Sequence, residues 1–474
     1  MAAYGFGQLG EALVTVGFNT FLLYFYNQVL HVSGTITGIA LAISLVVDAV
    51  IDPMAGALSD RLKSKWGRRH PYIVLSALPL GGCFFLIFNP PAGLGEIELA
   101  AWLVMWTLLT RIALTFFHVP HLALGAEMAH DYNQRSTLYS FNTLFSIFGA
   151  AGGTALAYAL FFPTTPEHNP GLLNPHGYVL FSLSFGIVVT CAVLVCAAGT
   201  WGEIPHLASS GRNTTSFTLR RVFDETRDAF RNRSFRAIFF GMSLSTLMLA
   251  MEGVLTPYMG VHFWGLTTEQ ISTIPLVSFL GLIVGTALVP AVTRWLDKKR
   301  TLIYCSLISL IMPNLFIGMR LLDVPGFPEN GSPWVLVIVI SINVVLYTIV
   351  PLVFASLNAM FADIVDEHEL DTGFRREGIV FAARSFLIKA ISSVGIIIGG
   401  WVIDFIEFPR GARSGTVPDD VLWNLGLYQT PLPSILVLVG ILLYSGYQLD
   451  RARHAEIVRQ LEARRATMSA AKAA

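Results

Sequence analysis

The chain has 474 residues, of which 54% are hydrophobic and only 13% are charged, and its formal net charge is zero. Soluble domains carry about 25% charged residues, so a chain this poor in charge is expected to contact lipid rather than water. A net charge of zero gives no reason to expect nucleic acid as a partner. The composition therefore predicts an integral membrane protein.

Apolar stretches long enough to cross a bilayer recur along the whole chain, since a spanning helix needs about 20 mostly apolar residues. Twelve segments reach that length: 5–30, 33–59, 71–91, 98–127, 137–162, 177–201, 235–262, 269–294, 300–321, 334–364, 377–407 and 431–449. The first residues lack the charged start and the cleavage site of a secretory signal peptide. We therefore predict an all-α protein whose first span begins almost at once.

Lysine and arginine collect on one side of these spans. Segments after even-numbered spans are basic, whereas segments after odd-numbered spans contain few basic residues. The positive-inside rule therefore places both termini in the cytoplasm. We expect a multi-pass protein of the bacterial inner (plasma) membrane that functions as a monomer.

A polar stretch at 202–234 leaves six spans on each side. Similar basic loops, "SDRLKSKWGRR" and "TRWLDKKR", follow the second span of each half. Two related six-helix halves with a binding site at their seam resemble the plan of the major facilitator superfamily. We expect an N-terminal bundle at 1–201, a cytoplasmic central loop at 202–234 with a short amphipathic helix, a C-terminal bundle at 235–449 and a cytoplasmic tail at 450–474.

Two acids, Asp48 and Asp52, lie inside the second apolar span. A charge in the middle of a span costs about 2.5–3.5 kcal/mol even on lenient insertion scales. Four residues apart, the two carboxylates project from one helical face and disfavour each other's ionisation. Such a pair must bind a cation, hold a proton or pair with a basic side chain. Pro53 adds a local break because it leaves the carbonyl of Ala49 without its helical donor.

Other polar residues fall at the same depth as this acidic pair. The helical rise places Lys389 of the eleventh span level with Asp48. Arg111, Thr115 and His118 share one face of the fourth span, because they are spaced by four and three residues. We expect these groups to meet near the middle of the membrane as a site for Na⁺ or H⁺. The alternative is a purely structural network of the four charged residues that only locks helices together.

Several motifs resemble one known transporter family. They are "YGFGQLGEAL" near the start, "DAVIDPMAGALSDR" and "GRRHPYI" across spans two and three, "FHVPHLALGAEM" in span four and "DTGFRREGIVFAARSFLIKA" leading into span eleven. Together they resemble the glycoside–pentoside–hexuronide:cation symporter family, which includes melibiose permease-like proteins. The resemblance implies that Asp48, Asp52 and Thr115 bind the coupling cation, and that Lys389 links the cation and sugar sites.

The sugar-binding positions implied by that family are altered in this chain. The family pattern has acids at Ala12 and His118, a tryptophan at Leu122 and an arginine near Thr143. None of these is present, so melibiose-like galactosides are doubtful substrates. The "FHVP" sequence is also similar to that of related sodium-coupled lysophospholipid transporters. The solute is therefore expected to be a sugar or glycoside by family, with a lysolipid or other amphipathic solute as the alternative.

The residues expected to line the coupling and substrate cavity are Lys389, Arg111, His118, Glu252, Asn19 and Arg384. Arg111 would be a counter-ion of Asp48 that favours protons over sodium. His118 is either a proton acceptor or a hydrogen-bonded core residue, and both interpretations stay open. Glu252 either binds substrate or pairs with a polar neighbour. For Glu11 the sequence favours a gate or interfacial role over a ligand role.

The basic loop at 61–69 is expected mainly to set the topology, and also to close an inner gate by pairing with acids such as Glu127. The expected gate residues are Arg61, Arg68, Arg69, Glu127, Arg375 and Arg376. The acidic run from Asp363 to Asp371 lacks a fixed ligand spacing, so no metal site is expected beyond Na⁺ at the acidic pair. The four cysteines lie in apolar runs and are expected to be reduced packing residues.

These patterns predict a secondary active symporter that works by alternating access. Its partners would be a small-molecule solute and membrane lipid, with no nucleic acid and no cofactor other than the coupling ion. No nucleotide-binding loop is found in the sequence. Two other classes of membrane protein are alternatives to a symporter. A membrane-embedded transferase would use His118 and an acid, and a channel or scramblase would carry solute downhill, indifferent to ion gradients.

Overall fold

The fold is described from a computed structural model, which covers the chain except residues 63, 129–131, 207–229, 231, 373–376 and 474. Every regular element in the described residues is helical. Twelve helices or continuous helical runs within them are long and apolar enough to cross a membrane. The prediction of an all-α protein with twelve spans is therefore confirmed.

The N-terminal half contains six spans. Its elements are α1 (Ala2–Val16), η1 (Gly17–Phe21), α2 (Leu22–Tyr24), η2 (Phe25–Val29), α3 (Gly34–Arg61), α4 (His70–Ile87), α5 (Glu96–Met128), α6 (Tyr132–Ile147), η3 (Phe148–Gly152), α7 (Gly153–Leu156), η4 (Ala157–Phe161), η5 (Gly171–Leu173), α8 (Pro175–Gly199) and η6 (Trp201–His206). The segments η1, η2, η3 and η4 are π-helical turns that continue the first and fifth spans.

The C-terminal half supplies the other six spans. Its elements are α10 (Arg233–Tyr258), the π-helical η7 (Met259–Phe263), α11 (Thr268–Leu296), α12 (Lys298–Leu321), α13 (Pro333–Thr372), α14 (Glu377–Phe405), α15 (Asp419–Gln429), α16 (Ser434–Ser445) and α17 (Arg451–Ala473). The first span of each half thus ends in π-helical turns. Such turns are often found at functional sites.

Some boundaries differ from those expected from the sequence. The last span runs from Asp419 to Ser445 as α15 and α16, not from 431 to 449. The sequence "TPLP" at 430–433 interrupts it, because proline has no N–H for the helical ladder. Helix α13 continues to Thr372, eight residues beyond the expected end at 364. The amphipathic helix expected within 202–234 falls largely outside the described residues.

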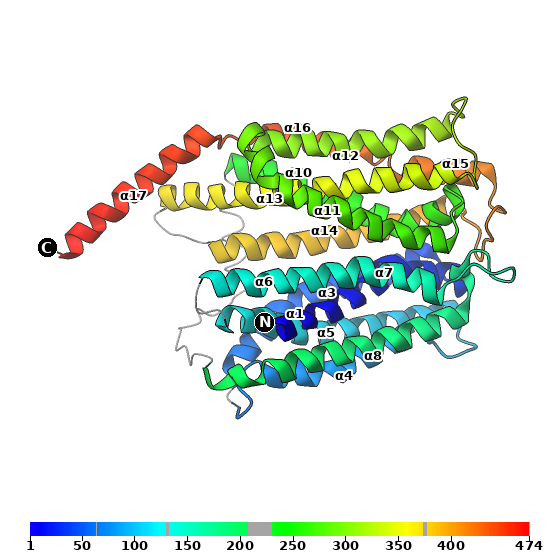
Figure 1. Ribbon diagram of the computed structural model, residues 1–474, viewed down its shortest axis with the longest axis horizontal. Helices are drawn as coiled ribbons and strands as arrows, with labels where there is room; N and C mark the ends of the chain where they lie inside the picture. The colour runs from blue at the N-terminus through cyan, green and yellow to red at the C-terminus, as the bar shows by residue number, and fades with distance from the viewer. Residues whose placement is uncertain (63, 129–131, 207–229, 231, 373–376, 474) are drawn as a thin grey trace.

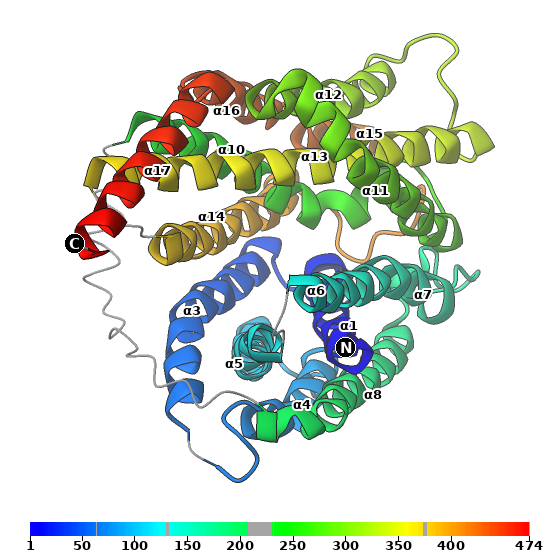
Figure 2. The ribbon, with the colours of Figure 1, turned by 60° about the vertical axis from the view of Figure 1, so that its left-hand side comes forward.

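The spans run roughly side by side along the long axis of the molecule, and both chain ends lie at the same end of the bundle (Figure 1). Seen from nearer that end, the N-terminal spans form one group and the C-terminal spans another (Figure 2). The groups meet along three pairs of spans: α3 with α14, η1 and α2 with α10, and the run of η3, α7 and η4 with α11. The buried charges of the second, fourth and eleventh spans are carried by α3, α5 and α14, so α3 and α14 bring them to this seam.

The ends of the two halves that are remote from the termini are joined. Asp404 of α14 accepts four hydrogen bonds from the start of α3: from Ser33 Oγ at 2.6 Å, Gly34 N at 2.9 Å, Thr35 N at 2.8 Å and Thr35 Oγ1 at 2.6 Å. A carboxylate at a helix N-terminus also interacts favourably with the helix dipole. Since the positive-inside rule makes this the outer side, Asp404 forms an outer latch between the halves.

Further contacts support the same closure. Tyr258 donates to Asn27 Oδ1 at 2.9 Å, and Thr164 N donates to Glu269 Oε1 at 2.6 Å. Gly34 lies so close to α14 that a Cβ atom there would be 2.5 Å from the carbonyl oxygen of Gly400. Small residues allow such close approach of helices within membranes. The structure is therefore closed toward the outer side.

Within the N-terminal half, α4 and α8 cross at two facing glycines. A Cβ atom on Gly81 would collide with the carbonyl oxygen of Gly186 and with Thr190 Oγ1. The neighbouring Gly82 is exposed, and a Cβ atom there would have nothing within 4 Å. Gly81 is therefore a buried test position, and the adjacent Gly82 is an exposed control position.

We expect Gly81→Val to destabilise the protein by about 1–3 kcal/mol, the usual cost of overpacking a tight contact. Thermal unfolding in detergent, followed by fluorescence-detected gel filtration, would show a lower Tm for Gly81→Val. Gly82→Val makes the same chemical change one residue along and is expected to leave the Tm unchanged. Equal Tm values for the two variants would show that the α4–α8 crossing is not this tight.

Candidate cation-coupling site

The centre of the seam holds the two acids of α3. Thr115 of α5 donates its hydroxyl to Asp48 Oδ1 at 2.8 Å and to Asp52 Oδ1 at 3.0 Å. Asp48 is buried and Asp52 is partly exposed. The arrangement gathers carboxylate and hydroxyl oxygens, which are hard ligands suited to Na⁺. The sequence placed these residues at one depth, and the structure brings them into contact.

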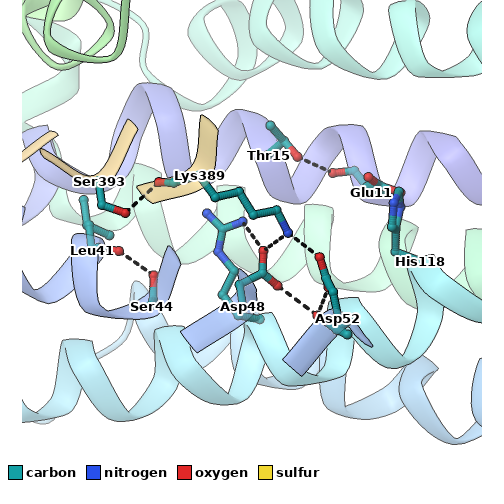
Figure 3. A network of polar contacts seen from close by, with 11 residues as sticks. Glu11, Thr15, Leu41, Ser44, Asp48, Asp52, His118, Lys389 and Ser393 are labelled. Carbon is teal, nitrogen blue, oxygen red and sulfur yellow. Dashed lines mark hydrogen bonds and ion pairs between the residues drawn. The ribbon is translucent and has the colours of Figure 1, made fainter. Parts of the chain in front are cut away.

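A side chain from the opposite half completes this cluster (Figure 3). Lys389 Nζ of α14 lies 2.8 Å from Asp48 Oδ2 and 2.5 Å from Asp52 Oδ2. The ammonium group therefore bridges both carboxylates across the seam. Charge-assisted hydrogen bonds of this kind are roughly twice as strong as neutral ones, so Lys389 holds the centres of the two halves together.

Arg111 of α5 approaches the same oxygen of Asp48 as Lys389 does. Its Nη1 is 3.9 Å from Asp48 Oδ2, and its guanidinium lies over the ring of Phe18 at 4.7 Å from the ring centre. The buried Arg111 Nε has no hydrogen-bond partner in the described part of the chain. The two carboxylates and the two basic side chains together carry a formal charge of zero. The cluster is thus neutral without any added ion.

A second ionisable pair lies beside this cluster, between α1 and α5. His118 Nδ1 is 2.7 Å from Glu11 Oε2, and the two side chains point toward one another (Figure 3). The sequence favoured a gate or interfacial role for Glu11, whereas the structure gives it an internal partner on another span. The spacing of Arg111, Thr115 and His118 places all three on one face of α5, and this indicated that His118 points toward the interior of the protein. No sequence signal identified the facing residue on α1.

Three other cavity candidates lie apart from these contacts. Glu252 of α10 is 3.4 Å from Thr430 Oγ1, within the C-terminal half. Arg384 of α14 donates to Asn358 Oδ1 at 2.7 Å and lies over the ring of Phe361. Asn19 is exposed on the π-helical turn η1. None of the three contacts the acidic pair in the described residues, and their expected role in the cavity stays a prediction.

The basic loop after α3 pairs within its own half. Glu127 of α5 accepts from Arg68 at 3.1 Å and from Arg69 at 2.9 Å. Arg69 also pairs with Asp60 at 2.6 Å and bonds to Ser59. Arg61 is exposed at the end of α3. The remaining gate candidates, Arg375 and Arg376, lie outside the described residues, so a role of this loop in gating stays a prediction.

The sequence profile of the family described as "MFS/sugar transport protein" matches residues 3–451. The chain belongs to this MFS/sugar transport protein family. The family resemblance found in the motifs is thereby confirmed. A member of this family is a transporter and not an enzyme, so the transferase interpretation is set aside.

Relatives in the MFS/sugar transport protein family match almost the whole chain. The "Uncharacterized symporter sll1374" of Synechocystis sp. is 27% identical, over 98% of this chain and 96% of the relative. The "Putative glycoside/cation symporter YagG" of Escherichia coli is 25% identical, over 99% of this chain and 95% of the relative. The xylose transporter XylE from E. coli in its inward-open conformation has a TM-score of 0.59 at 15% identity, covering 97% of this chain and 98% of that chain. That similarity supports the fold alone.

Proposed function

We propose that this multi-pass membrane protein is a cation-coupled symporter of a small glycoside-like solute that works by alternating access. The observation that carries the proposal is the Lys389 ammonium group, which bridges Asp48 and Asp52 from the opposite half of the protein. Buried ionisable groups within membrane spans commonly mark ion pathways. A site divided between two halves can also respond when the halves move apart.

The internal charges suggest how a cation would be coupled. A cation that binds the two carboxylates must displace the Lys389 ammonium group, because both need the same oxygens. The cation is a co-substrate, either Na⁺ held by the oxygens of Asp48, Asp52 and Thr115, or H⁺ on a carboxylate. Displacement frees Lys389 and removes one tie between the halves. Lys389 therefore acts as a tethered cation that occupies the acidic pair when the co-substrate is absent.

The neutrality of the four-charge cluster also suggests how the protein changes its facing side again after it has released its cation and solute. Two bare carboxylates at the seam would cost several kcal/mol per uncompensated charge in a medium of low dielectric constant. Lys389 removes that cost once the cation has left, so the empty protein can change its facing side. If the cation tightens solute binding, linkage requires the solute to tighten cation binding by the same factor.

The class of solute is proposed from the relatives. Printed names among them include a putative glycoside/cation symporter, lactose permeases and an isoprimeverose transporter. One relative, YicJ of E. coli, is named an inner membrane symporter, which favours the same location for this chain. The altered positions Ala12, His118, Leu122 and Thr143 distinguish this chain from the melibiose pattern, so the glycoside is expected to differ from melibiose.

Reconstituted proteoliposomes provide the test. Uptake of radiolabelled lactose, isoprimeverose and a lysophosphatidylglycerol would be measured under an imposed Na⁺ gradient, an imposed pH gradient and no gradient. We expect one of the two sugars to accumulate above equilibrium only with an ion gradient. If only the lysolipid accumulates with an ion gradient, the solute is a lysolipid and not a glycoside. If solute moves only down its own gradient, whatever the Na⁺ and pH gradients are, the protein is not a symporter.

A substitution of Lys389 tests the tethered-cation mechanism directly. We expect Lys389→Gln to slow net uptake strongly while exchange of internal for external solute continues, because exchange never requires the empty protein to return. The expected loss of net uptake is about tenfold or more, which corresponds to about 1.4 kcal/mol in the barrier of the return step. Arg236→Gln is the control, since it neutralises an exposed cation at the start of α10 that does not contact the acids. Equal loss of net uptake and exchange would contradict the mechanism.

A further inference from the structure

The pair formed by Glu11 and His118 has no role in the mechanism above. Glu11 comes from α1 and His118 from α5, and neither bonds to the neutral cluster of Asp48, Asp52, Arg111 and Lys389 among the described contacts. The two side chains retain 18% and 33% of their exposed surface. They are therefore buried enough to interact strongly and open enough for water to reach them.

When Glu11 is ionised, its hydrogen bond to His118 determines which ring nitrogen carries the hydrogen. An ionised carboxylate can only accept, so His118 Nδ1 carries the hydrogen that is donated to Glu11 Oε2. His118 Nε2 then has no partner in the described part of the chain. A proton arriving from water would bind at this nitrogen. The pair would change from a charge of minus one to zero, with no other bond made or broken.

The surroundings supply both signs of charge. The ionisable groups that face the pair are Asp52 from α3, Lys389 from α14, Tyr4 from α1, and both Arg111 and the buried His121 from α5 itself. His121 Nε2 donates to the backbone oxygen of Tyr4 and its ring stacks on that tyrosine, so its proton is fixed. From α6 and α8, Tyr139 and Cys196 face Tyr4.

Histidine is the side chain whose free imidazole titrates within the physiological range, near pH 6.5. The four-charge cluster is already neutral, whereas this pair becomes neutral only when it binds a proton. We infer that Glu11 and His118 form a proton-binding site distinct from the Asp48–Asp52 site, so that the transport cycle binds and releases a proton there. This inference rests on the proposed symport and names a second ion for the cycle.

The site would load from the space at the seam, because Lys389 of the opposite half faces it. When the halves rock, the same nitrogen would meet water on the other side and release the proton. The histidine would thus make transport depend on pH even if Na⁺ is the ion bound by Asp48 and Asp52. A merely structural pair would instead keep one protonation state throughout the cycle.

Nuclear magnetic resonance of histidine-¹⁵N-labelled full-length protein in detergent tests the site without any solute. We expect one ring signal, absent in His118→Gln, to titrate with a midpoint between about pH 5 and 8. Glu11→Gln is expected to move that midpoint, because it removes the anionic partner. His176→Gln, which removes an exposed histidine at the start of α8, is the control and should leave the titration unchanged. Absence of a titrating signal from His118 would overturn the inference.

Transport assays distinguish failure of this site from failure of symport. In proteoliposomes with a trapped pH indicator and a fixed membrane potential, lactose or isoprimeverose would be added in the presence of Na⁺ and in its absence. We expect solute-dependent proton entry in the wild-type protein and at least about a tenfold loss in His118→Gln. Proton entry that is unchanged in His118→Gln but lost in Asp52→Asn would refute the second site and preserve symport. If the His118 ring signal titrates as expected but no solute accumulates against its gradient, symport is rejected and the proton site at Glu11 and His118 is retained.

Discussion

We expect Asp52→Asn to abolish uphill accumulation of solute while the protein still folds. The amide keeps the size of the side chain and can still accept from Thr115, which lies 3.0 Å from Asp52 Oδ1. The loss of one negative charge leaves the cluster with a formal charge of plus one, contributed by Arg111 and Lys389. A coupling cation would then be repelled rather than bound.

Uptake in proteoliposomes under a Na⁺ or pH gradient measures this effect. Coupling free energies of about 1–3 kcal/mol correspond to about 5- to 150-fold changes in affinity. We expect Asp52→Asn to lose this coupling, so that an ion gradient no longer increases the accumulation of solute. Equilibration of solute down its own gradient should persist. Glu98→Gln is the control, because it neutralises an exposed acid at the outer end of α5. Undiminished accumulation by Asp52→Asn would refute the role of this acid.

The second large effect is expected at the outer latch, where Asp404→Asn weakens the contact between α14 and the start of α3. The carboxylate accepts four hydrogen bonds there, two of them from the backbone of Gly34 and Thr35. Hydrogen bonds to a charged group contribute about 1.5–3 kcal/mol each, so loss of the charge shifts the balance toward the state that opens outward. A loss of about 1.4 kcal/mol would already raise its relative population about tenfold.

Distances between spin labels on the outer loops report this change. Labels at Ala92 and Glu329 sit on exposed outer loops of the N-terminal and C-terminal halves. We expect Asp404→Asn to add or enlarge a population with a longer distance between them. Asp420→Asn, which neutralises an exposed acid in the first turn of α15, should not. Identical distance distributions for Asp404→Asn and the wild-type protein would show that Asp404 does not hold the outer side closed.

The sequence predicted the architecture well because lipid imposes simple rules. Span number follows from length and hydropathy, and orientation follows from the distribution of lysine and arginine. The proximity of Asp48, Thr115 and Lys389 followed from depth alone, since uncompensated charges in a span are costly. Their roles in binding an ion remain predictions, although their contacts agree with them.

The contacts that the sequence did not predict depend on how helices are rotated and which elements face each other. Glu11 and His118 meet because α1 and α5 present those faces to one another, and no local pattern specifies that pairing. Asp404 was overlooked because it lies near the outer end of its span, where an acid normally faces water. For Glu252 the sequence left open substrate binding or a polar neighbour, and its partner, Thr430, lies at the start of a helix break that hydropathy did not locate.

The π-helical turns in the first and seventh spans have a consequence for how the chain tolerates length changes. Each such turn holds one residue more than an α-helical turn, and η2 and η7 lie where Asn27 and Tyr258 meet across the outer seam. Deleting one residue from such a segment would restore a regular helix without shortening the membrane crossing by more than about 1.5 Å. Single-residue insertions and deletions among homologous chains should therefore collect in these segments, because the rest of the span keeps its register there, whereas the same change within a regular α-helix would rotate everything beyond it by about 100°.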